Sequence, residues 1–593
     1  MERSSFPRFL LLALAAVLAF IYVPRLWSER GSEVQPIGVG LTETAEFAIG
    51  KEAPPTCAIQ QDGRFSAELT SRGAALLSYR LTGDSRYTDA EGKPLELTSV
   101  AADAPDRLAL RSDWRSMGVT GEDAQVAKDV VDWKIASQSP THCTFRYEDD
   151  EVALEKTFRV GERPFEIVVS STIENRSDAT KKHRLAVENT AWRRNEDVKG
   201  SLGRVSPLMT DVACSSAGKL ERKHLEDFEP GDFKEPEFHN GWLVQGSQAE
   251  FTATSTAYFT QALVPVAGPA PQCALQIEER WFRDQYPDKT KDPAYGAMYR
   301  SRLLYPTVEL APGAKTTYEQ IAFIGPKDRH VLAAAAGGQH HLTELIDLGM
   351  FAVISKVLVA LLLKIYGVVG NWGVAIIILT VCVRVLLLPL TWKQIQSMLA
   401  MRRLKPEIDE INRKYANDVQ QKQVAMMEMY RKNGVNPFGG CLPVLVQMPV
   451  WWALYGTLQT AVEFYHTPFL WFGDLSAPDP YFILPIVIGL TAFLQQKLMP
   501  QTAMDPAQAK MMLYMMPAIF TVMMLFLPSG LGVYILTNSV LGILQQQIVE
   551  RFAPSAPSGG IEVKEKSPDD DGGTPQGQGG SRKFGTVPAK LKG

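Results

Sequence analysis

A single arginine, Arg384, interrupts an apolar segment that carries no other charge between residues 365 and 392. An arginine at the centre of a membrane-spanning helix costs about 2.5 to 3.5 kcal/mol on insertion scales, so such residues usually face water or a polar partner. No acidic residue occurs in the core of any apolar segment that follows. The sequence therefore predicts a wet cavity in which Arg384 attracts an anionic group. The alternative is a structural arginine paired with a carbonyl or a carboxylate.

Polar side chains recur on the apolar segments at helical spacing. Thr380 lies four residues before Arg384 on the same helical face, and Tyr534 and Asn538 repeat this spacing in the last apolar segment. Gln447 adds a polar group to an earlier segment. We predict that these five residues line one hydrophilic groove between helices. Interhelical hydrogen bonding, which such side chains provide at about 0.6 to 2 kcal/mol each, is the alternative for any one of them.

Several membrane-spanning helices must surround this groove, and charge-poor segments of suitable length supply them. Since about 20 apolar residues cross a bilayer, the predicted spans are residues 372–392, 443–463, 481–498, 512–528 and 531–550. Lysine and arginine number nine between residues 393 and 432 and zero between residues 464 and 481. By the positive-inside rule, the basic segments and the C-terminus lie in the cytoplasm, and the uncharged segments lie outside.

Two earlier apolar segments have different interpretations. Residues 1–28 predict an N-terminal transmembrane anchor with a cytoplasmic N-terminus, and a cleaved signal peptide is the alternative. Residues 345–370 are long enough to span, but Lys356 and Lys364 leave one broad face apolar. A span here would also place the preceding domain in the cytoplasm, against the arginine-flanked export signal. We therefore predict an amphipathic helix in the membrane surface and six spans in total.

The segment 393–432 has mixed charge, and its apolar residues recur at helical spacing on both sides of the sequence YAND. This pattern predicts a cytoplasmic helical hairpin. Methionine is flexible and polarizable and suits surfaces that accept varied partners, although ordinary packing is the alternative for each one. The hairpin residues that we expect to contact such partners are Met398, Met401, Arg402, Arg403, Met426 and Met427.

Residues 57–330 alternate polar and apolar side chains in short segments bounded by Gly, Pro, Asn and Asp. This is typical of β-strands, and the length favours one large antiparallel sandwich outside the cytoplasm. Residues 29–56 read as a tether before it. Residues 553–593, which are rich in Gly, Pro, Ser and charge, predict a disordered cytoplasmic tail. The net charge of −4 is a sum over these different parts, so it does not indicate a function.

The sandwich segment contains four cysteines, Cys57, Cys143, Cys214 and Cys273. Export permits disulfides, but the wide spacing makes the reduced state at least as good an expectation. The chain has no CxxC motif, no GxGxxG, no P-loop and no nucleophile elbow. We therefore expect no metal, no cofactor and no catalytic residue.

Four segments together resemble a known family. They are NWGVAIIILTVCVRVLLLPLT, NPFGGCLPVLVQMPVWWALY, DPYFILPI and LPSGLGVYILTNSVLGILQQQ. They are similar to the YidC/Oxa/Alb family of membrane protein insertases, in the long form of Gram-negative bacteria. The match is dense over about residues 345–552. The soluble domain matches only by size, position and strand-rich character.

The resemblance implies a β-supersandwich in the periplasm and an insertase core, residues 371–552, in the inner membrane. Arg384 matches the groove arginine, Thr380 a substrate-facing hydroxyl and Tyr534 a client contact, whereas Ile535 departs from a tyrosine pair found in some relatives. The implied partners are nascent membrane proteins, the ribosome, the Sec translocon and lipid, without sequence-specific nucleic acid. The implied activity is insertion and chaperoning of membrane proteins, alone or with the Sec translocon, and not enzymatic catalysis.

Two interpretations from other classes compete with this one. A secondary transporter or channel could use Arg384 to bind a small anion, but the chain shows no inverted repeat and no coupling carboxylate. The exported sandwich could instead be a membrane-anchored carbohydrate enzyme. Anion uptake or a glycan screen would separate these from an insertase.

Overall fold

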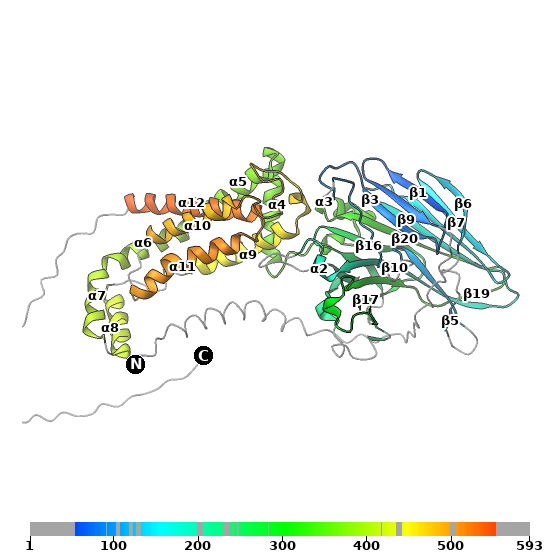
Figure 1. The fold of residues 1–593 in the computed structure, drawn as a ribbon, viewed down its shortest axis with the longest axis horizontal. Helices are drawn as coiled ribbons and strands as arrows, with labels where there is room; N and C mark the ends of the chain where they lie inside the picture. Colours follow the sequence, from blue (N-terminus) through cyan, green and yellow to red (C-terminus); the bar gives the residue numbers. More distant parts are fainter. Residues whose placement is uncertain are drawn as a thin grey trace, which may run out of the picture.

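The computed structural model describes residues 54–552, except residues 90–91, 102–106, 118–122, 126–131, 199–205, 229–237, 240, 246–247, 283, 417, 434–441 and 499–505. The predicted N-terminal anchor, nearly all of the tether and the C-terminal tail lie outside these residues. The described chain forms a β-rich part followed by a helical part (Figure 1). This division confirms the coarse fold predicted from the sequence.

In the described part of the chain, the strands form three antiparallel sheets. The smallest contains β1 (Thr56–Gln61), β2 (Phe65–Thr70) and β3 (Ala75–Leu81). The second sheet has the order β13 (Phe238–His239), β14 (Trp242–Gln245), β17 (Gln272–Arg280), β18 (Gly296–Leu304), β10 (Lys181–Arg194), β4 (Arg111–Met117) and β5 (Asp123–Gln125), with β19 (Val308–Leu310) beside β10. The third has the order β12 (Lys219–Lys223), β11 (Asp211–Ser216), β15 (Ala249–Ser255), β16 (Phe259–Ala267), β20 (Lys315–Pro326), β9 (Glu166–Asn175), β8 (Val152–Val160), β7 (His142–Glu148) and β6 (Lys134–Ser139).

Alternating side chains hold the two large sheets together as a sandwich. Along β9, buried residues alternate with partly exposed ones, as expected for a strand with one face on a core. Polar contacts also cross between the layers. Asn189 Nδ2 on β10 donates to the Gln261 carbonyl on β16 at 2.9 Å.

Two disulfides join different sheets, and they correct the expectation that the cysteines are reduced. Cys57 on β1 pairs with Cys143 on β7, and Cys214 on β11 pairs with Cys273 on β17. Their sequence separations are 86 and 59 residues, but the folded sheets bring their Cα atoms to 6.5 and 6.1 Å. The spacing of the cysteines along the sequence therefore did not predict the disulfides, because the packing of the sheets sets the distance between the paired cysteines.

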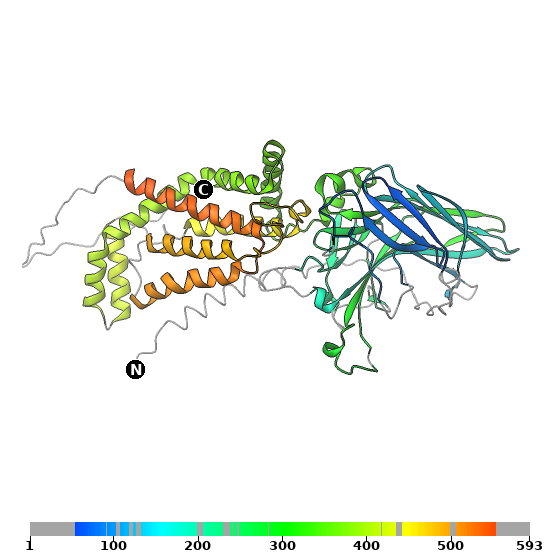
Figure 2. The ribbon, with the colours of Figure 1, turned by 45° about the horizontal axis from the view of Figure 1, so that its top comes forward.

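The helical part follows two short helices, α2 (Asn195–Val198) and α3 (Arg329–Ala334), that belong to the sandwich. Its helices are α4 (Ala352–Val369), α5 (Trp372–Leu386), α6 (Leu388–Arg403), α7 (Lys405–Lys414), α8 (Val419–Lys432), α9 (Leu442–Thr460), α10 (Ile483–Leu498), α11 (Pro506–Met524) and α12 (Ser529–Phe552). Figures 1 and 2 show α9 to α12 running along one bundle, with the sandwich at one end and the α7–α8 hairpin at the other.

The span predicted at residues 372–392 is not one helix. Helix α5 ends at Leu386, and α6 begins at Leu388 and continues into the hairpin. Pro389 is the second residue of α6. Because proline has no N–H and clashes with the preceding turn, it suits a helix start and cannot continue α5 without a break.

Helix α4 lies across the end of the bundle that faces the sandwich (Figure 2). Among the described helices, it is the one long and apolar enough to cross a membrane, by length and composition, and α5, α10 and Lys510–Met524 are shorter apolar helices. Its exposed side includes Val353, Val357 and Val368 together with both lysines, Lys356 and Lys364. A helix that exposes valines and lysines side by side suits the boundary between lipid and water.

Aromatic side chains fix the sandwich to the bundle. Tyr465, which follows α9, packs against Tyr258 and Phe259 of the sandwich with ring centroids 5.1 and 5.6 Å apart. His466 Nδ1 lies 2.9 Å from the Arg86 carbonyl oxygen. The two parts therefore meet through specific contacts and not only through the linker before α4.

Candidate functional site

Arg384 on α5 is hydrogen-bonded to α12. Its Nε donates to Asn538 Oδ1 at 2.6 Å, its Nη2 donates to the Asn538 carbonyl at 2.7 Å, and its Nη1 reaches Gln545 Oε1 at 3.5 Å. All of these acceptors are uncharged oxygens. Three of the five N–H groups of Arg384 therefore have acceptors among the described residues, and no carboxylate there balances its positive charge. The contact with the Asn538 carbonyl is the kind of pairing that the alternative interpretation, a structural arginine, requires. The missing carboxylate is what the interpretation as an anion-attracting arginine requires.

The local sequence of α12 explains why this contact forms. Asn538 and Gln545 are seven residues apart and share one face of the helix. Gly542 lies between them, and a Cβ atom there would come within 3.0 Å of Arg384 Nη2 and 3.3 Å of Gln495 Nε2. Glycine therefore leaves the space that the guanidinium occupies. Sequence reasoning missed Gly542, although its position four residues after Asn538 was the available signal.

A cavity of about 310 Å³ opens beside this contact, between α9, α10, α11 and α12. Asn538 both lines the cavity and accepts from Arg384, whereas Arg384 itself does not line it. The residues that line it are Trp451, Ile488, Ala492, Gln495, Gln496, Met516, Pro517, Phe520, Tyr534, Ile535, Asn538 and Ser539. The lining of the cavity thus contains amide and hydroxyl groups as well as aromatic and methionine side chains.

The other predicted groove residues divide into two groups. Tyr534 lines the cavity, and its hydroxyl oxygen accepts a 2.9 Å hydrogen bond from Gln447 Nε2. Thr380 differs from expectation, because it is fully buried and its hydroxyl donates to the Ile376 carbonyl of its own helix at 2.7 Å. A threonine hydroxyl in a helix readily satisfies itself in this way, so a polar stripe on α5 did not require a polar cavity.

The predicted contact residues of the hairpin also differ in their surroundings. Met401 and Met426 pack against the small core of the hairpin itself, formed by Leu404, Ile408, Met429 and Tyr430. Met427 is 56% exposed, and Arg403 is exposed as well. The side chains of Met398 and Arg402 lie outside the described part of the chain.

Among the described residues, we find no arrangement of side chains that would support metal or covalent chemistry. Within those residues, no cluster of three or more His, Cys, Asp or Glu side chains could hold a metal ion. The arrangement offers instead an uncompensated cation, several amide groups and a mostly apolar cavity. It can attract and partly solvate a polar, negatively charged segment.

Comparison with known proteins identifies the chain. Residues 59–361 match the family described as YidC periplasmic domain, and residues 364–556 match that described as 60Kd inner membrane protein. A membrane protein insertase YidC from Anaeromyxobacter sp. (strain K) is 36% identical over 504 residues, covering 83% of this chain and 85% of the relative. The chain belongs to the YidC family of membrane protein insertases.

Another relative agrees with this assignment. The YidC insertase of Citrifermentans bemidjiense is 32% identical over 489 residues, covering 82% of this chain and 84% of the relative. The crystal structure of an active YidC insertase with its first transmembrane domain resolved has 17% identity and a TM-score of 0.35, covering 85% of this chain and 95% of that one.

Because the chain belongs to the YidC family, its general activity follows. The chain is a membrane protein insertase of the inner membrane, its clients are nascent membrane proteins, and it is not a catalyst of covalent chemistry. The family resemblance seen in the sequence is confirmed. Its members' names favour neither of the two competing interpretations, the small-anion transporter and the anchored carbohydrate enzyme.

Proposed function

We propose that Arg384 and the adjoining cavity form the groove through which this insertase passes short, acidic extracytoplasmic segments of its clients. The observation that carries the proposal is the pairing of Arg384 with neutral oxygens only, beside a cavity of about 310 Å³ lined by Tyr534 and Asn538. A charge that is held in place but not neutralised stays available to an incoming anion.

The physical task is to lower a desolvation penalty. An ionised carboxylate in an apolar medium without partners costs many kcal/mol, so a client segment that carries one cannot cross lipid unaided. A guanidinium in the bilayer, together with Gln495, Gln496 and Asn538, replaces part of the lost hydration and shortens the dry path. The apolar helix of the client then leaves sideways into lipid. No nucleotide takes part in this mechanism.

The arrangement of the two parts supports a defined topology. We place the sandwich in the periplasm and the α7–α8 hairpin in the cytoplasm, because they lie at opposite ends of the bundle (Figure 1). Helices α5, α9, α10, α11 and α12 then span the membrane, with the N-terminal segment as the sixth span. Helix α4 lies in the outer membrane surface, and both termini are cytoplasmic.

The hairpin is the part proposed to meet the translation machinery. Arg403 and Met427 are exposed on it, so they remain available to a ribosome or to a nascent chain. Cooperation with the Sec translocon belongs to the same proposal, since clients of both routes would enter the groove from the lipid side. Crosslinking from position 427 to a stalled ribosome–nascent chain complex tests the hairpin contact.

The groove is tested by reconstituted insertion. Full-length protein with Arg384→Gln should insert a client with an acidic translocated segment about tenfold more slowly, which corresponds to about 1.4 kcal/mol. A matched client whose acidic residues are replaced by amides should be much less affected. Arg384→Lys, which keeps the charge, should retain most of the activity. Equal insertion of both clients by wild type and Arg384→Gln would refute the electrostatic role.

A further inference from the structure

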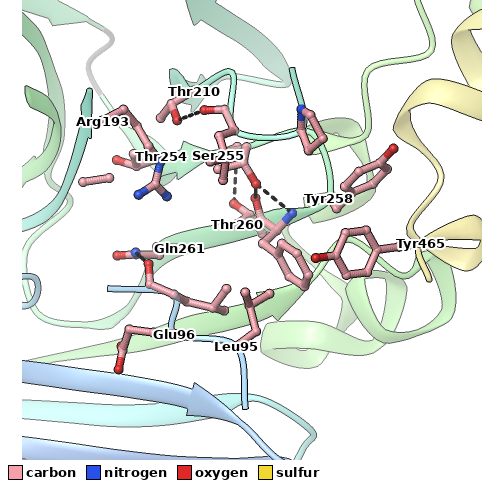
Figure 3. Close-up of a pocket in the computed structure, with 16 residues that line it drawn as sticks. Leu95, Glu96, Arg193, Thr210, Thr254, Ser255, Tyr258, Thr260, Gln261 and Tyr465 are labelled. Atoms are coloured by element: carbon pink, nitrogen blue, oxygen red, sulfur yellow. Dashed lines mark hydrogen bonds between the residues drawn. The ribbon is translucent and has the colours of Figure 1, made fainter. Parts of the chain in front are cut away.

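A second cavity, of about 100 Å³, lies in the sandwich where it meets Tyr465 of the helical part. Strands β10, β15 and β16 and residues 95–97 and 207–210 contribute to its wall. Figure 3 shows Arg193 and Gln261 on one side, Tyr465 on the other, and the hydroxyl side chains between them. None of its lining residues belongs to the groove at Arg384.

Two polar atoms of residues that line this cavity have no partner in the part of the chain that the structure describes. Arg193 Nη1 donates to Ser99 Oγ at 2.7 Å and to the Trp192 carbonyl at 3.0 Å, but its Nε is buried without an acceptor in the described residues. Gln261 is 5% exposed, and its Nε2 donates to the Leu97 carbonyl at 3.1 Å. Its Oε1 is buried without a donor in the same part of the chain. Both atoms are closed off from the cavity itself, so what the lining offers an entering ligand is the positive charge of Arg193 and not these two atoms.

The charge of Arg193 is also unmatched by nearby carboxylates. Glu96 lines the cavity, but it accepts from Ser78 Oγ at 2.5 Å and from the Tyr79 N–H at 2.7 Å, and it pairs with Arg80 at 3.2 Å. In Figure 3 its carboxylate points away from Arg193. Asp197, the other neighbouring acid, is held by Arg194 at 2.9 Å.

We propose that this cavity binds a carboxylate, with Arg193 as the cationic anchor. A single guanidinium matches a monoanion. The rest of the wall is mainly apolar, with Leu95, Leu97 and Leu208 among its residues, which suits a short carbon chain. A phosphate monoester carries nearly two negative charges at neutral pH, and the single guanidinium balances only one of them.

Burial lowers the pKa of Arg193 from its ordinary value, yet an arginine remains charged at neutral pH. The hydroxyls of Ser255 and Thr260 lie 2.8 Å apart, and either can donate. They can therefore turn toward a carboxylate oxygen when one enters. The cavity has roughly the volume of three water molecules, so it accepts a carboxylate head with only a few carbon atoms.

The carboxylate has two sources. It is either a free short-chain carboxylate or an aspartate or glutamate side chain of a client segment that has reached the outer side. The second source rests on the proposed insertase topology, and the first does not. Leu208, which is 43% exposed at the wall, provides a position for a crosslinker that distinguishes them.

Binding is measured on the full-length protein in lipid nanodiscs by ligand-observed NMR. Butyrate is the probe, butyramide is its neutral isostere, and methyl phosphate is the competing anion. We expect butyrate to bind at least about tenfold more tightly than the other two, since a charged hydrogen-bonded pair is worth more than a neutral one. Equal binding of butyrate and butyramide, tighter binding of methyl phosphate or no binding at all overturns the proposal.

Variants locate the site. Arg193→Gln should weaken butyrate binding about tenfold or more, whereas Arg159→Gln, a change at an exposed arginine of β8 that does not line the cavity, should leave it unchanged. Arg193→Lys keeps the charge and should retain part of the affinity. It serves as the second variant if Arg193→Gln lowers the melting temperature. An unchanged affinity in Arg193→Gln, or an equal loss in Arg159→Gln, contradicts the assignment.

A photocrosslinker at position 208 then identifies the source. Crosslinks to a stalled client with an acidic translocated segment, absent for the amide form and suppressed by butyrate, assign the site to client side chains. Butyrate binding without such crosslinks assigns it to a free carboxylate. Because the binding assay needs no insertion, failure of this proposal is distinct from failure of the groove proposal.

Discussion

Buried arginines have opposite environments in the two parts of the molecule. In the sandwich, Arg300 and Arg302 are 1% and 6% exposed, and both pair with Glu188, at 3.0 and 2.5 Å. Their guanidinium groups also lie 4.6 and 3.8 Å from the ring centroid of Trp242. In the bundle, Arg384 meets only carbonyl and amide oxygens.

The arginines of the sandwich have a carboxylate partner that neutralises their charge, whereas Arg384 has none among the described residues. Burial by itself raises the pKa of Glu188, but the positive charges of Arg300 and Arg302 outweigh this and hold the pKa well below its ordinary value. That carboxylate is therefore ionised and committed to its neighbours. Arg384 is hydrogen-bonded to neutral oxygens and has no carboxylate partner among the described residues, so its charge is not committed to a neighbour in this way.

The largest expected effect comes from breaking the ion pairs of the sandwich. Glu188→Gln leaves two buried arginines without their carboxylate and should lower the free energy of unfolding by about 3 to 5 kcal/mol. Glu309→Gln, which removes an exposed pair with Lys182, should cost less than about 1 kcal/mol. Denaturant unfolding of the full-length protein, followed by tryptophan fluorescence, measures both.

Acidity provides a second test of the same pair. Because the folded state lowers the pKa of Glu188, its contribution is present above the unfolded pKa of about 4.3 and is lost as the pH falls below it. The stability difference between wild type and Glu188→Gln should therefore narrow below about pH 4. A difference that is constant from pH 7 to pH 3 would show that packing, not charge, causes the loss.

The cysteines of the two parts also differ. The sandwich is closed by the Cys214–Cys273 disulfide, whereas Cys382 in the bundle is free and exposed. Cys214→Ser should destabilise the sandwich by about 2 to 4 kcal/mol under oxidising conditions. Cys382→Ser is the matched control and should change nothing measurable. If dithiothreitol leaves the wild-type unfolding curve unmoved, the disulfide does not stabilise the domain.

Lys327 adds a buried cation that, unlike arginine, can lose its charge. It is 2% exposed and donates to the Leu345 carbonyl at 3.2 Å, and burial lowers its pKa to about 8. Between pH 8 and its unfolded pKa of about 10.4, the unfolded state binds more protons than the folded one, so stability rises with pH by at most about 3 kcal/mol. This rise should disappear in Lys327→Met, as seen in unfolding curves from pH 7 to pH 10.

The smallest effect on stability is expected where a carboxylate is added to the bundle. Asn538→Asp gives Arg384 the ionic partner that it lacks and should change the free energy of unfolding by no more than about 1 kcal/mol. It should nevertheless reduce insertion of acidic clients to the level of Arg384→Gln, because the field of the arginine is cancelled. Normal insertion of acidic clients by a folded Asn538→Asp protein would contradict the comparison drawn above.

Parts of the site followed from local sequence. The isolated charge of Arg384 and the four-residue spacing of Tyr534 and Asn538 are visible without a structure, and the structure brings all three to one region. Thr380 followed the same pattern but bonds to its own helix. Gly542 was not predicted, because a missing side chain matters only when the neighbour that fills its space is known.

The sequence by itself determined the strand-rich and helical halves, the alternation of basic and uncharged segments and the presence of an arginine within an apolar segment, because periodicity and charge act over a few residues. Only the tertiary structure decided that Arg384 meets Asn538, that Cys57 meets Cys143 and that Arg193 lines a cavity beside Tyr465. These contacts join segments far apart along the chain. They depend on which helix and sheet faces pack together, and local spacing does not encode that choice.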